Sequence, residues 1–367
     1  MYLYWILILI TAWRALVKPR CSWSIPTSLF VWIILVVLIG LRDGVGGDWN
    51  TYERYYRIVN DPGWQFESTA GSLAYDYLNR LAGFYFFKGV SDFGNGIFLV
   101  NTIAAAIFSG GLVWFCRSTP RPWLALTTAI PYLVIVVGMG YTKQSIALGI
   151  LFFGFDALAN GFVWRYFIFI FFAGCFHFSS FVALPLVIPY INDSNKVINK
   201  IITVLFLILT AVIMSLIFLA NRWEFLLHGY FVDEYSSSGA YIRVALNLLP
   251  SLLFLLYGYR LDLNKNAILL WKTISIFTII CFVGLFVLPS TTVIDRLALY
   301  AIPIQLFVLS RLPDFKIFKY SPQIINFAVV SYSFALLFVW LYYGNYSSAW
   351  ADYRNLLFTW DTFNRSW

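Results

Sequence analysis

Apolar runs long enough to cross a hydrocarbon core of roughly 30 Å recur along the whole chain, separated by short polar segments. They predict spans at about residues 2–17, 27–41, 95–115, 123–139, 143–159, 199–220, 241–258, 267–288, 294–310 and 323–343. A further apolar block, residues 163–191, is too long for one upright helix and too short for two comfortable ones. Whether it crosses once or twice must be decided from orientation.

The longest polar segment, residues 42–93, contains two stretches of different character. The first, RDGVGGDWNTYERYYRIVNDPGW, is rich in Gly, Asp, Arg and Tyr. The second places apolar side chains at helical spacing on one face, namely Leu73, Tyr77, Leu78, Leu81 and Phe84, and polar ones opposite, namely Asp76, Asn79 and Arg80. This pattern predicts an amphipathic helix lying at the membrane surface.

Composition narrows the class of protein. Of the 367 residues, 61% are hydrophobic and 11% are charged, against about 25% charged in a soluble domain. An ordinary cytosolic enzyme is excluded, and no polar stretch is long enough to form a soluble sensing head. We expect an all-α polytopic integral membrane protein with about 11–12 transmembrane helices. It forms a single transmembrane domain over residues 1–367, with a second loop at 221–240 and a tail at 344–367.

The net charge of +8 is dispersed and forms no basic stripe, so we expect no nucleic-acid partner. If the block 163–191 crosses twice, one side holds fourteen of the 25 basic and four of the 17 acidic residues, about +10 against about −2 on the other. This asymmetry identifies the positive side as cytoplasmic. We therefore predict two short or broken helices around residues 174–180, about twelve crossings, and both termini outside; a re-entrant element is the alternative.

Cations at the outer ends of spans run against this charge bias, so each needs a local reason. They are Arg42, Lys143, Arg243 and Arg296 at span ends, with Arg54, Arg57, Arg222 and Arg354 in loops. One reason is an ion pair or a side chain that reaches the lipid headgroups. The other is an anionic ligand such as a lipid diphosphate, because Arg presents a planar fork of donors to phosphate oxygens.

Three further features have a structural and a chemical interpretation. The glycines of GLRDGVGGDWNTY, residues 40–52, either make a flexible loop or present backbone amides and Asp48 to a ligand. His177, in FHFSSF, is either a packing residue or a proton carrier. Asp295 and Arg296 are either a structural pair or catalytic groups. Outer aromatic residues could stack on sugar rings: Trp49, Tyr52, Tyr55, Trp64, Trp350 and Tyr353.

No motif for a metal or a nucleotide is present in the sequence. The four cysteines have no CxxC spacing and no clustered histidines, so we expect neither a disulfide nor a metal site. GxxxxGK[ST], GxGxxG, GxSxG and a DxD-type acidic pair are all missing. An enzyme of this composition is expected to work without a cofactor, with a donor activated by a lipid diphosphate leaving group.

Five motifs in order along the chain resemble one family. They are GLRDGVGGDWNTY at 40–52, the FE…Y…L stretch after it, YTKQSIALGI at 141–150, FHFSSF at 176–181 and IDRLALY at 294–300. Together they resemble the EpsG-like branch of the O-antigen and exopolysaccharide polymerases (Wzy). Two positions depart from the family pattern: Trp49 replaces a tyrosine, and Lys143 before Gln144 replaces an arginine, which removes bidentate phosphate geometry.

The resemblance implies a GT-C-like polymerase architecture in the bacterial inner membrane, with the active site and residues 42–93, 221–240 and 344–367 facing the periplasm. It implies a glycosyltransferase that polymerises oligosaccharide units carried on undecaprenyl diphosphate. Partners would be that lipid-linked oligosaccharide, membrane lipids, a chain-length regulator (polysaccharide co-polymerase) and a flippase.

On this reading each candidate residue has a role. The catalytic base is Asp48, ranked above His177; the diphosphate ligands are Arg42, Lys143, Arg296, Arg243 and Arg354; the sugar ligands are Trp49, Tyr52, Gln144, Tyr300 and Tyr353. Alanine at Arg42 or Asp48 is expected to abolish polymer and leave expression intact. The alternatives are a flippase of lipid-linked sugars and the ligase that joins polymer to lipid A core.

Overall fold

The computed structural model describes residues 1–64, 72–87, 95–193, 239–288, 290–315 and 320–357, together with Lys200, Ile201, Val204, Leu205, Ile208 and Ser237. It divides into two compact units. The first comprises Met1–Ile150, Cys175–His177 and Tyr320–Trp367, and the second comprises Leu151–Gly174 and Phe178–Lys319. The predicted span 199–220 and loop 221–240 lie almost wholly outside the described residues. The prediction of a single transmembrane domain stays a prediction.

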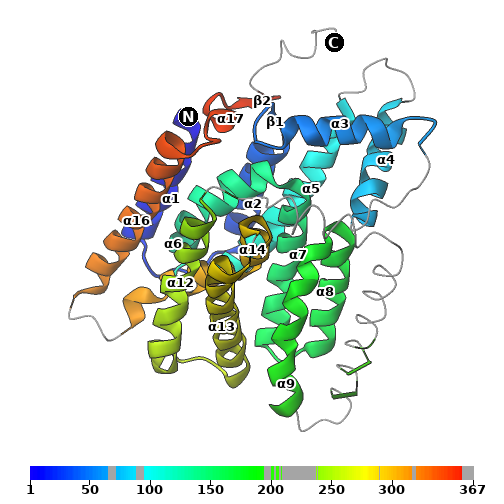
Figure 1. Ribbon diagram of the computed structural model, residues 1–367. Coiled ribbons are helices and arrows are strands. Elements are labelled where there is room, and N and C mark those ends of the chain that lie inside the picture. The colour runs from blue at the N-terminus through cyan, green and yellow to red at the C-terminus, as the bar shows by residue number, and fades with distance from the viewer. Residues whose placement is uncertain are drawn as a thin grey trace. The chain divides into compact units, whose positions relative to one another are not determined.

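The first unit is built mainly of helices (Figure 1). They are α1 Tyr2–Val17, α2 Ile25–Gly40, α3 Trp49–Asn60, α4 Leu73–Phe87, α5 Asn95–Arg117, α6 Pro122–Ala129, the π-helical η1 Ile130–Gly138, α7 Thr142–Ala159, α16 Pro322–Tyr343 and α17 Ser348–Ala351. The strands β1 Arg42–Asp43 and β2 Arg354–Asn355 pair antiparallel. α7 continues from this unit into the second one.

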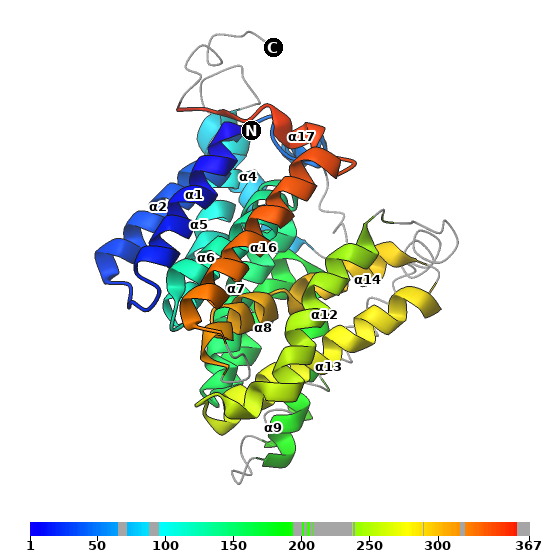
Figure 2. The ribbon, with the colours of Figure 1, turned by 90° about the vertical axis from the view of Figure 1, so that its left-hand side faces the viewer.

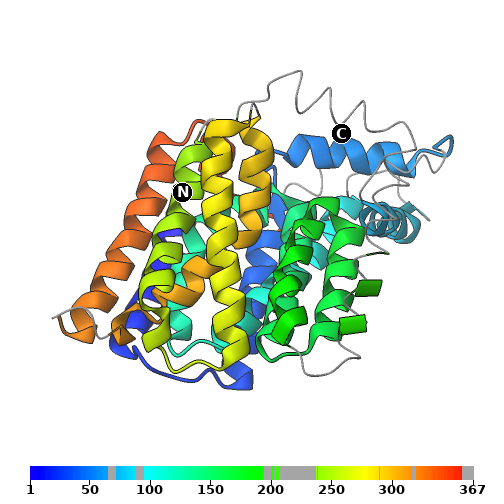
Figure 3. The same ribbon diagram turned by 60° about the horizontal axis from the view of Figure 1, so that its bottom comes forward.

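The second unit contains α8 Val163–Phe176, the 3-10 helix η2 Phe178–Val187, α9 Ile188–Asp193, α12 Ala240–Tyr257, η5 Gly258–Arg260, α13 Lys265–Val287, α14 Thr291–Ala298, η6 Leu299–Ala301, α15 Pro303–Leu309 and η7 Leu312–Asp314. α12 and α13 lie side by side (Figures 2 and 3). The predicted spans within the described residues therefore coincide with helices, which confirms an all-α membrane protein.

Only some of these helices reach full membrane-spanning length. In the described part of the chain, four do: Gly96–Arg117, Ala240–Arg260, Lys265–Val287 and Pro322–Tyr343. Thr291–Ala301 and Pro303–Asp314, bent by 43° at their junction, make a fifth if they form one span. Five further apolar helices have 10–17 residues, including α1 and α2. The multi-pass character is shown, whereas the total of 11–12 crossings and the GT-C-like architecture stay predictions.

Local sequence signals set where several helices begin. Ser24 accepts a hydrogen bond from the Thr27 amide at 3.3 Å, and Ser321 accepts one from the Ile324 amide at 3.4 Å. Asn264 accepts one from the Ala267 amide at 2.7 Å. Each side chain satisfies a backbone donor that has no partner within its helix, so α2, α16 and α13 start at these caps.

Glycines allow α5 and α7 to cross with their backbones in contact. A Cβ added to Gly111 would meet the Gly149 carbonyl oxygen at 1.9 Å, and one added to Gly149 would meet the Phe108 Cα at 2.5 Å. Small residues at such crossings let membrane helices approach closely. The position of α7, which carries Lys143, is thus determined by its contact with α5.

The apolar block 163–191 is a broken helical hairpin. α8 ends at Phe176, His177 is outside any helix, and η2 starts at Phe178. The Tyr166 hydroxyl donates to the Ala183 carbonyl at 2.5 Å, so the chain returns along α8 after the break. The break predicted at residues 174–180 is confirmed, and two crossings of the membrane stay a prediction.

The bend between α14 and α15 follows from Pro303, which has no amide hydrogen, and from a tight 3-10 turn. The Ile302 amide donates to Leu299 rather than to Ala298. The Ala298 carbonyl instead accepts a 3.1 Å bond from the Asn247 side-chain amide, and Gln305 donates to Asn247 at 2.6 Å. Since a backbone carbonyl left unbonded in an apolar interior is costly, the buried Asn247 makes the bend possible.

The amphipathic helix predicted at residues 73–84 is present as α4. Its polar residues Asp76 and Asn79 are buried, whereas Leu73, Tyr77, Leu81 and Phe84 are 46–65% exposed. α4 packs against α3 and α5 with this polar side. Leu78 departs from the pattern, because it is buried, and Arg80 is exposed. The apolar exposed face suits a lipid surface, but the position of α4 at the membrane surface stays a prediction.

The close α5–α7 crossing predicts that alanine has different effects on stability at two adjacent glycines. Gly111→Ala should destabilise the protein by about 1–3 kcal/mol, because the methyl group must displace the backbone of α7. Gly110→Ala is the matched control, since the nearest atom to its added Cβ is the Trp32 indole nitrogen at 3.6 Å. Thermal unfolding of the purified variants in detergent measures the stability of Gly111→Ala and Gly110→Ala. Equal melting temperatures for the two variants would contradict the tight crossing.

Candidate functional site

Residues from five parts of the chain meet at one end of the first unit. The Met1 amino group donates to the Ala351 carbonyl at 2.9 Å, and Arg42 pairs with Asn355 in the two-stranded sheet. The Trp350 indole donates to the Ile135 carbonyl at 2.8 Å. These contacts bring together the start of the chain, the 42–48 turn, the end of η1, the start of α7 and the C-terminal tail.

The glycines of the 42–48 turn serve close packing. Gly44 and Gly46 have positive φ angles of 65° and 110°, which disfavour any side chain. A Cβ on Gly46 would meet the Met139 carbonyl oxygen at 2.4 Å, and the Gly46 amide donates to Ala349. The turn thus presents this amide to the tail. Presentation of the other amides and of Asp48 to a ligand stays a prediction.

Arg42 is only 1% exposed and organises the turn. Its guanidinium donates from Nε to the Val45 carbonyl at 3.1 Å, from Nη1 to the Ile39 carbonyl at 2.5 Å and from Nη2 to the Thr142 hydroxyl at 3.2 Å. These partners are all neutral. Burial lowers the pKa of Arg42 to about 10, so the group keeps its charge at neutral pH.

Lys143 is half-buried in the first turn of α7, beside Thr142. Its Nζ donates to the Ser72 hydroxyl at 3.1 Å and lies 4.0 Å from the ring centre of Tyr55 and 4.9 Å from that of Tyr75. Such contacts between an ammonium and aromatic faces are attractive. Arg42 therefore contacts the first turn of α7, and Lys143 belongs to this turn.

Two predicted sugar ligands lie around this turn. Gln144 is buried, and its side-chain nitrogen has no hydrogen-bond partner in the described structure. The Tyr52 hydroxyl accepts a 3.4 Å bond from the Lys143 amide. An unpaired buried amide donor costs free energy unless a ligand or water completes it. The predicted role of Gln144 in sugar binding stays a prediction.

Asp48 and Trp49 stand where the turn becomes α3. Asp48 is half-buried and precedes the first residue of α3, and its carbonyl accepts from the Tyr52 amide at 3.0 Å. The Arg42 guanidinium lies 5.6 Å from the ring centre of Trp49. The sequence contains a signal for this helix, since Tyr52, Tyr55, Tyr56 and Val59 recur at helical spacing. The helix was nevertheless not predicted.

The remaining tail residues hold the tail in place. The Tyr353 hydroxyl donates to the Leu38 carbonyl at 2.7 Å, and its ring meets Tyr4 edge to face at 5.6 Å. Burial raises the pKa of Tyr353 to about 12. Arg354 is exposed and pairs with Asp352 at 3.6 Å. Their predicted roles, sugar binding by Tyr353 and diphosphate binding by Arg354, stay predictions.

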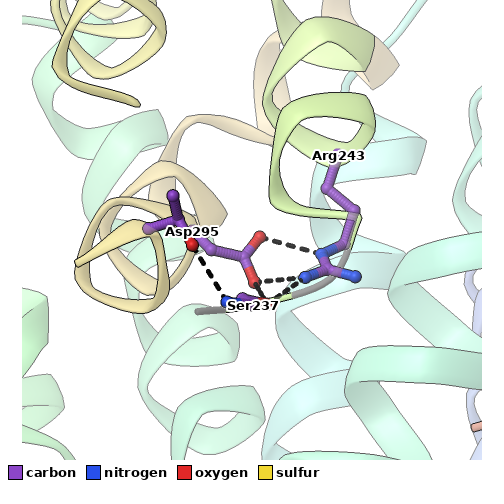
Figure 4. A network of polar contacts seen from close by, with 4 residues as sticks. Ser237, Arg243 and Asp295 are labelled. Carbon is purple, nitrogen blue, oxygen red and sulfur yellow. Dashed lines mark hydrogen bonds and ion pairs between the residues drawn. The ribbon is translucent and has the colours of Figure 1, made fainter. Parts of the chain in front are cut away.

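In the second unit, Arg243 is committed to Asp295 (Figure 4). Nε donates to Oδ1 at 2.8 Å and Nη2 to Oδ2 at 2.6 Å, a bidentate pair between α12 and α14. The Ser237 hydroxyl joins both, donating to Asp295 at 3.1 Å and accepting from Arg243 at 2.5 Å. Asp295 thus forms a bidentate pair with Arg243. The assignment of Arg243 as a diphosphate ligand stays a prediction.

Three more candidates lie near the breaks of the predicted spans. Arg296 is exposed at the end of α14. Tyr300 is buried at the bend, and its hydroxyl lies 2.9 Å from that of Ser179, two residues beyond His177. The motifs FHFSSF and IDRLALY therefore meet through Ser179 and Tyr300. His177 itself is half-buried at the break.

Sequence reasoning did not assign the residues that surround Lys143. Asp76 and Ser72 are polar residues of the predicted amphipathic segment, and Tyr55 was considered only as a sugar platform. Their convergence depends on the packing of α4 and α3 beside α7. In the described ranges, no group of three or more His, Cys, Asp or Glu residues could hold a metal ion.

The fold and the site define a class: a multi-pass helical membrane protein in which two cations meet at the start of one helix. Comparison with known families then places the chain within the class. The model of the EpsG family matches residues 27–355, and the chain belongs to this family. Membership suggests a role in polysaccharide polymerisation. No curated protein and no solved structure matches the chain.

The buried pair Arg243–Asp295 predicts a strong effect on stability. Either Arg243→Ala or Asp295→Ala should cost about 3 kcal/mol, because the remaining charge is left mostly buried without its partner. Asp352→Asn is the control, since its pair with Arg354 is solvent-exposed and exposed pairs contribute little. Unfolding in detergent provides the measurement, and melting temperatures equal to that of Asp352→Asn would show that the pair is dispensable.

Proposed function

We propose that the protein is a glycosyltransferase that polymerises oligosaccharide units carried on undecaprenyl diphosphate, at the periplasmic face of the bacterial inner membrane. The observation that carries the proposal is the convergence of Arg42 and Lys143 on the first turn of α7. The amino end of a helix carries partial positive charge, and two cations beside it favour a dianionic or more highly charged ligand. A lipid diphosphate is such a ligand, and family membership favours it.

Arg42 and Lys143 have different parts in this proposal. Three N–H groups of Arg42 are bonded to the protein, so it contributes charge and holds the turn against α7. Lys143 binds the diphosphate with its remaining N–H groups, and the unpaired amide nitrogen of Gln144 is available to a sugar hydroxyl.

The proposed reaction is a displacement at the anomeric carbon of the donor. An acceptor hydroxyl oxygen forms the new bond to this carbon, the bond from carbon to diphosphate oxygen breaks, and its electron pair leaves with the diphosphate. The hydroxyl proton passes to a base, for which we rank Asp48 above His177. Cations at the leaving group stabilise the charge that develops on it. Trp49 and Tyr52 lie beside Asp48 and are suited to contact a sugar ring.

Lys143→Ala should abolish polymer and lower the turnover of lipid-linked repeat units by about 100-fold, because a donor to the leaving group is lost. Lys143→Arg, the residue of the family pattern, should retain most of the activity. Lys272→Ala removes an exposed lysine of α13 and serves as control. The experiment expresses each variant in cells that lack the endogenous gene and examines the lipopolysaccharide ladder.

The ladder also separates the alternatives. Core carrying a single repeat unit indicates loss of the polymerase, whereas core without any unit indicates loss of a flippase or ligase. Normal polymer length in Lys143→Ala would contradict the proposal. Arg42→Ala is a poorer test than the sequence suggested, because truncating a fully buried guanidinium leaves two backbone carbonyls without donors and should reduce expression as well.

A further inference from the structure

Asp76 is a buried carboxylate whose hydrogen-bond partners both contact Lys143. Asp76 lies on α4 and is 1% exposed. Its Oδ1 accepts from the Ser72 hydroxyl at 3.3 Å and from the Tyr55 hydroxyl. Both donors are themselves in contact with Lys143, so the carboxylate acts on the ammonium group through two intermediaries.

The first route is a chain of hydrogen bonds in one direction. Lys143 Nζ donates to the Ser72 oxygen, and the Ser72 hydroxyl donates to Asp76. Each bond polarises the next, so the negative charge at its end strengthens the bond that holds Nζ. Without the carboxylate, the Ser72 hydroxyl would have no fixed orientation toward Lys143.

The second route passes through the ring of Tyr55. The hydroxyl donates to Asp76 while the ring face lies 4.0 Å from Nζ. A phenol that donates to a carboxylate gains electron density in its ring, which strengthens its attraction for a cation. The hydrogen bond also holds the ring at one orientation, so α3 and α4 together present a prepared cage to α7.

We infer that Asp76 is a positioning residue: it orients Ser72 and Tyr55 so that the Lys143 ammonium is held at one place beside the amino end of α7. This inference rests on the proposed function for its consequence, the preorganised binding of a diphosphate. Preorganised donors stabilise developing charge without reorganising, which explains why a buried carboxylate is kept close to an anion site.

The first test measures the position of Lys143 and needs no substrate. Asp76→Asn and Tyr55→Phe should each raise the rate at which an amine-specific acylating reagent labels Lys143, by about tenfold, because Nζ is released from its cage. Tyr77→Phe on the exposed face of α4 and Asp262→Asn in the second unit are the controls. Mass spectrometry of the full-length protein in lipid nanodiscs gives the rates. Unchanged labelling in both variants would overturn the inference.

The second test measures binding of inorganic pyrophosphate by calorimetry on the same protein. Asp76→Asn should weaken binding by about tenfold in the wild-type background and have no effect in the Lys143→Ala background, since the network acts through Lys143. Equal weakening in both backgrounds would assign Asp76 a general structural role and overturn the inference. Rescue by Asp76→Glu would support positioning.

Together the two tests distinguish an error in the proposed function from an error in the inference about Asp76. If the wild-type protein and Lys143→Ala do not differ in pyrophosphate binding, the proposed diphosphate site is wrong, whatever the labelling shows. If pyrophosphate binding depends on Lys143 but neither labelling nor binding responds to Asp76→Asn, the proposed function stands and Asp76 is not a positioning residue. Because Tyr55→Phe removes only a single oxygen atom, this variant still tests the inference if Asp76→Asn fails to fold.

Discussion

The buried guanidinium of Arg42 is the interaction on which the rest of the first unit depends. It ties the end of α2, the 42–48 turn and the start of α7 together through three hydrogen bonds to neutral groups. The strand that begins at Arg42 pairs with the tail, and the turn that follows leads into α3. A charge buried this deeply is costly unless it is solvated by the protein, so the surrounding carbonyls and hydroxyls must hold their positions.

Breaks in helices bring polar groups together at two places in the described structure. A carbonyl released from helical bonding in an apolar interior needs another donor, and Asn247 supplies one to Ala298 at the α14–α15 bend. The other break, at His177, brings Ser179 to Tyr300. Broken helices of membrane proteins are places where polar backbone can meet a polar ligand. The two breaks lie at or next to FHFSSF and IDRLALY, two of the motifs through which this sequence resembles the EpsG family, which fits a functional reason for them.

Several features followed from the sequence because they depend on local pattern. Apolar run length placed the spans. The break near His177 followed from charge asymmetry between loops. The helix 49–60 was missed, since its aromatic residues were considered as ligands for sugar and not as a packed helical face.

Residue types and their order thus determined the class of protein, the helices of the apolar spans, and the set of cations that oppose the charge bias. Only the tertiary structure divided that set: Arg243 is bound to Asp295, Arg42 is buried among carbonyls, and Lys143 is held by side chains of α3 and α4. It also turned Asp76 from the solvent face of a predicted surface helix into a buried partner. The physical reason is that helical periodicity defines a face, but only packing against other helices decides what that face meets.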